Sequence, residues 1–189
     1  MRTLPEILAR RPARDSRFLR IEEIDLAFSN GARRTFERLT ASGRGAVFIV
    51  AMRDRDTVLL VREYCVGLDR YELGVPKGRI DPGETALEAA NRELQEEAGF
   101  AARKLTSLIT LSLLPAYMTH KAEVILAEDL YSQSRPGDEP EGLDVVPWKL
   151  SELPALLGRD DVSEGRSIAA LYIARDFLAG NFRPRETAC

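Results

Sequence analysis

The sequence of 189 residues has few of the side chains that build transition-metal sites or disulfide scaffolds. Its single histidine, His120, excludes a metal site made from several histidines of one chain, and His120 itself is expected to be structural. The two cysteines, Cys65 and Cys189, lie far apart, so the sequence does not favour a disulfide-stabilised fold. This cysteine usage is typical of a protein in the reducing cytoplasm.

The sequence also lacks a long apolar run and an excess of positive charge. No apolar stretch approaches the roughly 20 residues of a membrane-spanning helix, so no membrane partner is expected. The formal net charge of -3 does not favour nucleic-acid binding driven by net charge. Residues 1–16 are rich in arginine but lack the apolar core of a secretory signal. We expect a flexible tail there and another at residues 183–189.

Alternating polarity predicts an N-terminal antiparallel hairpin. Residues 17–28 end in an alternation of apolar side chains with polar or small ones, which is the period of a half-buried strand. Asn30-Gly31 follows, a dipeptide typical of a two-residue turn between antiparallel strands. That turn would place Glu23 opposite Arg38, a favourable cross-strand pair.

The rest of the chain follows the order of a mixed α/β (α+β) domain. Runs of apolar and β-branched residues predict five further strands, and two amphipathic stretches predict helices. The strands are expected at residues 46–52, 57–64, 105–114, 122–130 and 143–150, and the helices at 85–98 and 163–180. This order favours a mixed sheet with helices packed on it. We expect a hairpin at 17–40, one domain at 41–182, and a long loop in the Gly- and Pro-rich segment 65–84.

The helix expected at residues 85–98 has its own start and stop signals. Thr85 and Glu88 have the spacing of a capping box, and Gly99 is a C-terminal stop. At 100° per residue, one apolar stripe is expected to face the core. This stripe consists of Leu87, Ala90, Leu94 and Ala98.

Three glutamates, Glu93, Glu96 and Glu97, gather near the end of this helix, away from the stripe. Like charges repel there, and the helix dipole disfavours anions in the last turn. A solvated helix face is one interpretation; a functional site, where a divalent cation offsets the repulsion, is the other. Carboxylate ligands suit Mg²⁺ or Mn²⁺ rather than zinc, and Mg²⁺ takes further ligands from water and phosphates. The second interpretation points to metal-assisted attack on a phosphate ester or anhydride.

The spacing to the preceding loop favours the second interpretation. Residues 78–100 fit the pattern G-x5-E-x7-R-E-U-x-E-E-x-G-U, where U is a bulky aliphatic or aromatic residue. The matching residues are Gly78, Glu84, Arg92, Glu93, Leu94, Glu96, Glu97, Gly99 and Phe100. This segment resembles the motif of the Nudix hydrolases, and the strand order resembles their fold, a mixed sheet sandwiched between helices. The family cleaves a nucleoside diphosphate linked to another moiety, by attack of water at phosphorus.

The resemblance implies a role for each polar motif residue. The metal-binding glutamates of the family correspond to Glu93, Glu96 and Glu97. Glu84 corresponds to a position that supports the site or helps to bind metal, and the backbone carbonyl of Lys77 to a further ligand. Arg92 corresponds to an arginine that orients a motif glutamate for catalysis. Two or three Mg²⁺ ions, or Mn²⁺ in their place, are expected.

Features outside the motif resemble the ADP-ribose pyrophosphatase branch of the family. This resemblance implies a homodimer in which the hairpin joins the two chains and helps to hold the adenine. Pro115 stands where that branch has a proline, and Tyr117 where diadenosine polyphosphate hydrolases have a tyrosine. Cys65 stands where the branch has an arginine, so Arg62 is the expected phosphate clamp. Glu72 is the other expected substrate contact, although it stands two positions before the glutamate of that branch.

The general base has more than one candidate. In the ADP-ribose branch it comes from an acidic loop after the motif, which implies Glu139 or Glu141, with Asp138 less favoured. Glu96 is the alternative, because other Nudix enzymes take the base from the motif helix. The acidic loop could also be an ordinary solvated loop.

The resemblance as a whole implies a Mg²⁺-dependent pyrophosphohydrolase of ADP-containing compounds. The expected substrates are the nucleotides ADP-ribose, diadenosine polyphosphates and NADH, cleaved by metal-activated water. One alternative is a pyrophosphohydrolase of nucleoside triphosphates or capped RNA. A non-catalytic Nudix module that senses ADP-ribose is another, but such a module typically loses motif glutamates that this chain retains.

Overall fold

The computed structural model describes residues 3–9, 19–41 and 43–184. Most of the predicted tail at 1–16 and the end of the tail at 183–189 lie outside these ranges, and the division of the chain at residues 16, 40 and 182 stays a prediction. The strands are β1 (Leu19–Ala27), β2 (Arg33–Ala41), β3 (Ala46–Met52), β4 (Thr57–Cys65), β5 (Arg70–Gly74), β6 (Lys77–Arg79), β7 (Phe100–Ser112), β8 (Lys121–Ser132) and β9 (Asp144–Lys149). The helices are α1 (Ala86–Ala98), a 3-10 turn (Leu150–Glu152), α2 (Leu153–Leu157) and α3 (Gly165–Leu178).

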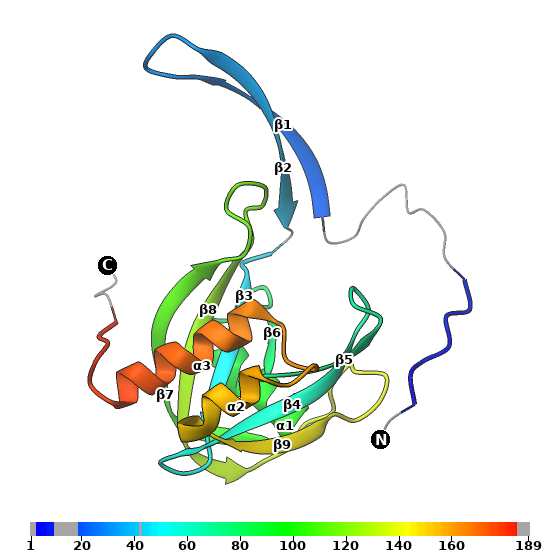
Figure 1. Cartoon of the computed structure of the whole chain (residues 1–189), viewed down its shortest axis with the longest axis vertical. Helices are drawn as coiled ribbons and strands as arrows, with labels where there is room; N and C mark the ends of the chain where they lie inside the picture. Colours follow the sequence, from blue (N-terminus) through cyan, green and yellow to red (C-terminus); the bar gives the residue numbers. More distant parts are fainter. Residues whose placement is uncertain (1–2, 10–18, 42, 185–189) are drawn as a thin grey trace.

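The central sheet is mixed and lies between helices, which confirms the predicted fold class. Its strand order is β5-β4-β3-β8-β7, with β6 paired to β3 and β9 paired to β4. The β3–β8 pair is parallel, and the other pairs of this sheet are antiparallel. In Figure 1, α2 and α3 cover one face of the sheet and α1 lies behind it.

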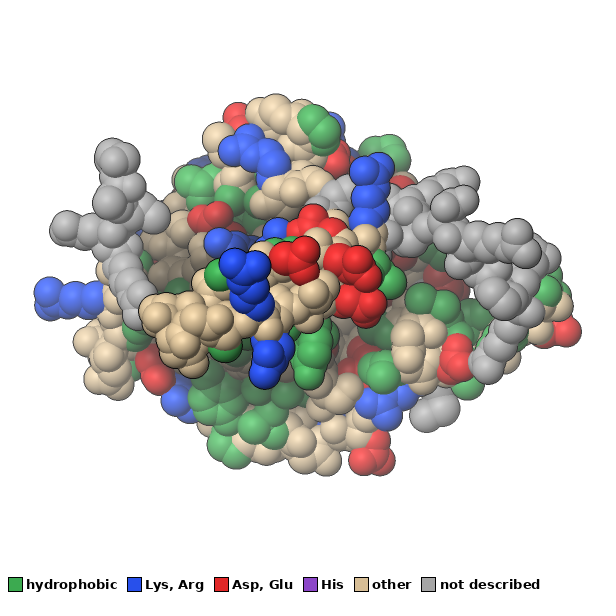
Figure 2. Space-filling view, turned by 90° about the horizontal axis from the view of Figure 1, so that it is seen from above, with side chains coloured by type: hydrophobic (Ala, Val, Ile, Leu, Met, Phe, Trp, Pro, Cys, Tyr) green, Lys and Arg blue, Asp and Glu red, His purple; other side chains and the backbone are tan. Residues whose placement is uncertain are grey.

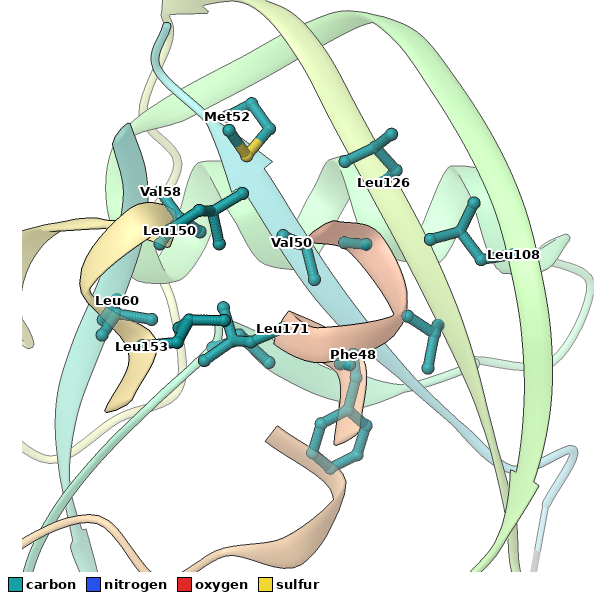
Figure 3. Packing of buried hydrophobic residues seen from close by; sticks show 14 of the residues in the cluster. Phe48, Val50, Met52, Val58, Leu60, Leu108, Leu126, Leu150, Leu153 and Leu171 are labelled. Carbon is teal, nitrogen blue, oxygen red and sulfur yellow. The ribbon is translucent and has the colours of Figure 1, made fainter. Parts of the chain in front are cut away.

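Strand β3 joins the two halves of the hydrophobic core, because all of its side chains are buried. Val47, Ile49 and Ala51 pack with the apolar side chains of α1. The alternate residues Phe48, Val50 and Met52 pack on the other face with α2 and α3 (Figure 3). Since a strand buried on both faces has no polar side, its continuous apolar run carries no alternation in the sequence.

The N-terminal hairpin of β1 and β2 forms a separate two-stranded sheet, as predicted, and extends away from the central sheet (Figure 1). Its predicted register is wrong by one residue, because Arg38 pairs with Glu22 and not with Glu23. The loop of residues 29–31 is closed by a hydrogen bond from the Phe28 amide to the Ala32 carbonyl at 2.8 Å. Gly31 has a φ of 81°, the left-handed position that a three-residue hairpin loop requires.

The segment 65–84 is more regular than the sequence indicated. Instead of one long loop it contains β5 and β6, which pair with β4 and β3 respectively. Glycine and proline lower the intrinsic strand preference of such a segment, but pairing with buried neighbours outweighs that preference. Pro147 lies on β9, which pairs with β4 at the border of the sheet, as expected for a proline in a strand.

Helix α1 confirms the predicted signals at both ends. The capping box between Thr85 and Glu88 is complete, and Gly99 closes the helix in a left-handed conformation with a φ of 73°. The predicted apolar stripe is wrong at one position, because Leu87 is 38% exposed and Ala89 faces the sheet instead. Among the described residues, no helix is long and apolar enough to cross a membrane.

We expect Gly99→Ala to lower the free energy of unfolding by about 1 kcal/mol, because an L-residue is strained in the left-handed region. A Cβ at Gly99 would meet only the Ser134 Cβ, at 4.0 Å, so the cost is conformational rather than steric. Gly158→Ala is the control, since Gly158 ends α2 with an ordinary φ of -78°. The measurement is urea-induced unfolding of both variants. Equal midpoints for the two would contradict the assignment of strain to Gly99.

Candidate active site

A cavity of about 650 Å³ brings the motif carboxylates together with residues from distant parts of the chain. Strands β3 and β6, helix α1, the loop after β8 and the start of α3 all contribute to its wall. The lining residues are Ala46, Phe48, Glu63, Lys77, Gly78, Arg79, Asp81, Arg92, Glu93, Glu96, Glu97, His120, Pro136, Gly137, Asp138, Glu139 and Arg166. The predicted helix site and the predicted acidic loop therefore share one cavity.

Arg92 is hydrogen-bonded to three of the motif carboxylates. Its Nη1 donates to Glu93 Oε1 at 2.7 Å and to Glu96 Oε2 at 3.0 Å. Its Nε and Nη2 donate to the two oxygens of Glu84, at 2.8 and 3.0 Å, and Nη2 also donates to the Arg79 carbonyl. Hydrogen bonding to Arg92 lowers the pKa of Glu84, and hydrogen bonding to Glu84 raises the pKa of Arg92. One guanidinium thus offsets the repulsion among carboxylates that the sequence leaves unexplained.

Glu97 makes different contacts from the other motif glutamates. Its Oε2 accepts a hydrogen bond from the Lys77 backbone amide at 2.9 Å. Burial raises the pKa of Glu97 to about 8; Lys77 opposes the shift, while Glu63 and Glu93 add to it. The Lys77 ammonium is paired with Glu63. Glu97 is therefore the motif carboxylate whose ionisation most needs a nearby cation.

Gly78 allows β6 and α1 to approach closely. A Cβ at this position would collide with the Glu93 carboxylate, so any other residue would displace this carboxylate from its present position. Burial also raises the pKa of Glu93, against the opposing effect of Arg92. The close approach of Glu93 thus explains the glycine at this motif position. The residue before it, Lys77, carries the backbone carbonyl that the resemblance implies as a metal ligand.

The chemistry of these side chains fits a hard divalent cation. Glu93, Glu96 and Glu97 offer oxygen donors to one cavity, and two of them have raised pKa values that a cation would lower. Within the described ranges, no group of three His, Cys, Asp or Glu residues is already arranged as a metal cluster. In the present arrangement, Arg92 and the Lys77 amide are hydrogen-bonded to these carboxylates.

The acidic loop after β8 packs against the end of α1. The Arg135 amide donates to the Gln95 carbonyl at 3.2 Å, and Gly137 lies against Glu96. Glu139 lines the cavity, and its pKa is raised by partial burial and by the charge of Glu63. Glu141 accepts a hydrogen bond from the Tyr71 hydroxyl, and together with Glu139 it lines a smaller cavity that also contacts the three motif glutamates of α1. Of the two glutamates predicted as base candidates, Glu139 therefore fits a proton acceptor of this cavity better, because it lines the cavity and its pKa is raised.

Two of the predicted substrate contacts lie away from this cavity. Arg62 is paired with Asp161 and lines a different cavity beside β9 and the residues after α2. Glu72 is only 4% exposed, and its Oε2 accepts hydrogen bonds from the Ser163 amide and hydroxyl at 2.9 and 2.8 Å. A buried carboxylate held in this way fixes the segment before α3. The roles of Arg62 and Glu72 as substrate contacts stay predictions.

Pro115 and Tyr117 lie in the loop between β7 and β8, beside the base of the hairpin. The Tyr117 carbonyl accepts a hydrogen bond from the Leu39 amide of β2 at 2.7 Å. The Tyr117 side chain is 65% exposed, and neither residue lines the cavity of the motif glutamates. Within one chain, these two residues are therefore not brought together with the motif.

Sequence reasoning missed several residues of the cavity wall. In the sequence, Phe48 looks like an ordinary core residue of a strand, and Glu63 like a polar residue at the end of a strand. Arg166 looks like a residue on the exposed face of a helix, yet all three line the cavity. His120, which was expected to be structural, also lies in this wall. Its pKa is lowered, mainly by burial and also by the positive charge of Arg166. No spacing rule links these residues to the motif, because the sheet alone brings them together.

Comparisons with known proteins agree with this geometry. The family model for the NUDIX domain matches residues 43–171, and the model for the NudE-type Nudix hydrolase N-terminal domain matches residues 5–38. The chain is 48% identical over 179 residues to the "ADP compounds hydrolase NudE" of Escherichia coli (strain K12), covering 95% of this chain and 96% of that protein. It is 27% identical to an "ADP-ribose pyrophosphatase" of Bacillus subtilis (strain 168), over 81% and 82% of the two chains. A crystal structure of an ADP compounds hydrolase superposes with a TM-score of 0.81 at 47% identity, covering 94% of this chain and 96% of that one.

The raised pKa of Glu97 predicts how the stability of the metal-free protein depends on pH. The pKa of this carboxyl is about 8 in the folded chain and about 4.5 as its ordinary value, so between these values the folded state binds more protons than the unfolded state. The resulting stabilisation is present at low pH and is lost as the pH rises towards about 8. Glu97→Gln removes it, so the melting temperature of the wild type in EDTA should fall relative to that of Glu97→Gln by a few degrees between about pH 5 and pH 8.

Thermal melts of both proteins at each pH, with and without Mg²⁺, are the measurement. Mg²⁺ at about pH 8 should raise the melting temperature of the wild type more than that of Glu97→Gln. Parallel pH profiles of the two metal-free proteins would contradict the assignment to Glu97.

Proposed function

The chain belongs to the Nudix hydrolase family, and from this premise we propose that it is a Mg²⁺-dependent pyrophosphohydrolase of ADP-containing compounds. The proposed substrates are ADP-ribose, diadenosine polyphosphates and NADH, of which ADP-ribose is the first to test. Nudix hydrolases generally use divalent metal ions. The presence of Mg²⁺ or Mn²⁺, and of two or three such ions, is part of the proposal.

One observation carries this proposal. The motif glutamates, held by Arg92 and the Lys77 amide, face the same cavity as the acidic loop and the start of α3. A relative with almost full-length similarity has the name ADP compounds hydrolase. Together, a carboxylate-rich cavity and this relationship favour cleavage of a diphosphate linked to adenosine.

The proposed mechanism assigns a role to each carboxylate of the motif. Glu93, Glu96 and Glu97, together with the Lys77 carbonyl, would hold the divalent ions, and Glu84 would support them through Arg92. Bound ions neutralise the diphosphate and lower the pKa of the attacking water. Arg92 fixes the orientation of the glutamates, and the Lys77 amide fixes that of Glu97.

We assign the general base to Glu139 in preference to Glu141 and Glu96. Glu139 lines the cavity, and its raised pKa is closer to the working pH of a proton acceptor. Glu141 is engaged by the Tyr71 hydroxyl, and Glu96 by Arg92. A carboxylate oxygen of Glu139 would accept the proton of the water that attacks phosphorus.

The adenosine side of the substrate is proposed to involve a second copy of the chain. The hairpin exposes Leu26, Phe28 and Phe36, and Tyr117 is exposed at its base. Figure 2 looks onto the hairpin side of the molecule and shows acidic, basic and hydrophobic side chains close together there. Exposed aliphatic and aromatic side chains on a protruding hairpin suit a homodimer interface, in which Pro115 and Tyr117 would serve the adenine. The cytoplasmic location also stays a prediction.

The alternative functions differ from the proposal in measurable ways. A pyrophosphohydrolase of nucleoside triphosphates or capped RNA would prefer those compounds in a substrate panel. A non-catalytic module that senses ADP-ribose would bind it without cleaving it. The retained motif glutamates and their shared cavity favour an enzyme over such a module.

The wild-type protein should cleave ADP-ribose in the presence of Mg²⁺ to AMP and ribose 5-phosphate. Glu97→Gln should lower kcat roughly 100-fold or more, because it removes a carboxylate that would hold the divalent cation, and that cation would stabilise the negative charge of the transition state. Product analysis by chromatography at saturating Mg²⁺ is the measurement. Failure of the wild type to cleave any ADP-linked compound, with Glu97→Gln no different, would refute the proposed function.

The assignment of the base predicts an order among three variants. Glu139→Gln should lower kcat roughly 100-fold or more while KM changes little, because general-base catalysis contributes about that factor. Glu141→Gln, which can still accept a hydrogen bond from Tyr71, should retain most of the activity. Steady-state kinetics of these variants and of Glu96→Gln give the answer. Near-normal turnover by Glu139→Gln would refute its assignment as the base, and an inactive Glu141→Gln would then identify Glu141. Glu96→Gln would count as the base variant only if it is inactive with an unchanged affinity for Mg²⁺.

A further inference from the structure

The wall of the cavity formed by α3 contains a cation that the mechanism above does not use. Arg166 lies in the first turn of α3, the helix that covers the opposite face of the sheet from α1. Its side chain nevertheless lines the same cavity as Glu93, Glu96 and Glu97. The cavity therefore has carboxylates on the α1 side and a guanidinium on the α3 side.

Neighbouring side chains fix the Arg166 guanidinium in place. Its Nε donates to Glu164 Oε1 at 2.7 Å, and Glu164 is itself held as the N-cap of α3 by the Ser167 amide at 2.6 Å. The guanidinium lies over the Phe48 ring, 4.6 Å from its centroid. Figure 3 shows Phe48 at the end of the buried cluster, next to this helix. Because the side chain is only 22% exposed and held on two sides, a ligand would bind it with little loss of conformational entropy.

The two Nη groups of Arg166 remain available. Glu164 takes the Nε proton, and within the part of the chain that the structure describes the Nη groups donate to no other residue. An arginine presents these donors in a planar fork that matches phosphate oxygens. Two of the other cations of the cavity are more fully engaged, since Lys77 is paired with Glu63 and Arg92 with three carboxylates. The third, Arg79, is an exposed residue of β6 on the wall opposite α3, and it has contacts of its own. His120 has a lowered pKa, so it adds no positive charge at neutral pH.

We propose that Arg166 is a substrate-binding residue that donates hydrogen bonds to a phosphate oxygen of the diphosphate, from the α3 side of the cavity. The proposal rests on the proposed function, because it names a further contact for the same substrate. A diphosphate between the two walls meets the metal-binding carboxylates on one side and this guanidinium on the other. Arg166 adds affinity for the diphosphate without touching the water or its base.

The test compares Arg166→Met with Arg175→Met. Arg175 is a matched control on the same helix, because its guanidinium also lies over an aromatic ring, at 4.5 Å from the Tyr172 centroid, and pairs with a carboxylate, Asp176, at 2.8 Å. It does not line the cavity. Arg166→Met should raise KM for ADP-ribose roughly 10- to 100-fold, the effect of one lost hydrogen bond to a charged group, while kcat changes much less. Arg175→Met should leave both constants unchanged.

Equilibrium binding keeps this inference separate from the proposed function. Isothermal titration with Mg²⁺ and either the non-hydrolysable methylene analogue of ADP-ribose or inorganic pyrophosphate should show a similar 10- to 100-fold weakening in Arg166→Met alone. Normal affinity of Arg166→Met for both probes, with melting curves like those of Arg175→Met, would overturn the proposal while the proposed function stands. Weaker pyrophosphate binding by Arg166→Met than by the wild type, with a wild type that cleaves no ADP-linked compound, would support the role of Arg166 and refute the proposed substrates. A lower melting temperature with unchanged affinity would show that Arg166 only stabilises α3.

Discussion

The contact on which the site depends is the set of hydrogen bonds from Arg92 to Glu84, Glu93 and Glu96. Carboxylates crowded into the last turns of a helix repel one another and oppose the helix dipole. A rigid guanidinium with several donors holds these side chains in fixed positions at a modest cost. Without it, the free energy of folding would disfavour the cluster that a divalent cation needs. Arg92 is thus a permanent positive charge within the protein that positions these carboxylates before divalent cations bind.

The central sheet determines which other residues lie opposite this cluster of carboxylates. Strand β3 is buried on both faces, so it carries the packing of α1 on one side and of α3 on the other. Strand β6 pairs with β3 and brings Gly78 against Glu93, so close that a Cβ at Gly78 would displace the Glu93 carboxylate. The acidic loop then lies against the end of α1 through Gly137. Carboxylates, candidate base and the Arg166 guanidinium meet in one cavity because each is attached to an element that packs on the same strands.

Much of the fold could be predicted from the sequence, because local signals agreed with tertiary packing. Thr85, Glu88 and Gly99 fixed the ends of α1, and continuous apolar runs located β3 and β4. The failures came where packing outweighs local preference. Residues 65–84 form two strands by pairing with buried neighbours. The hairpin register depends on the conformation of Gly31, which the dipeptide Asn30-Gly31 leaves open between two loop lengths.

The sequence by itself determined the motif chemistry of this protein. The spacing from Gly78 to Phe100 specifies which carboxylates share a helix face, since helical geometry turns spacing into position. Only the tertiary structure decided which other side chains face them. Arg62 and Glu72 were expected at the substrate, yet they are engaged by Asp161 and Ser163 away from the cavity. Arg166 gave no signal in the sequence and lies in the wall, because contacts between residues far apart in the chain depend on how strands and helices pack, which no local pattern encodes.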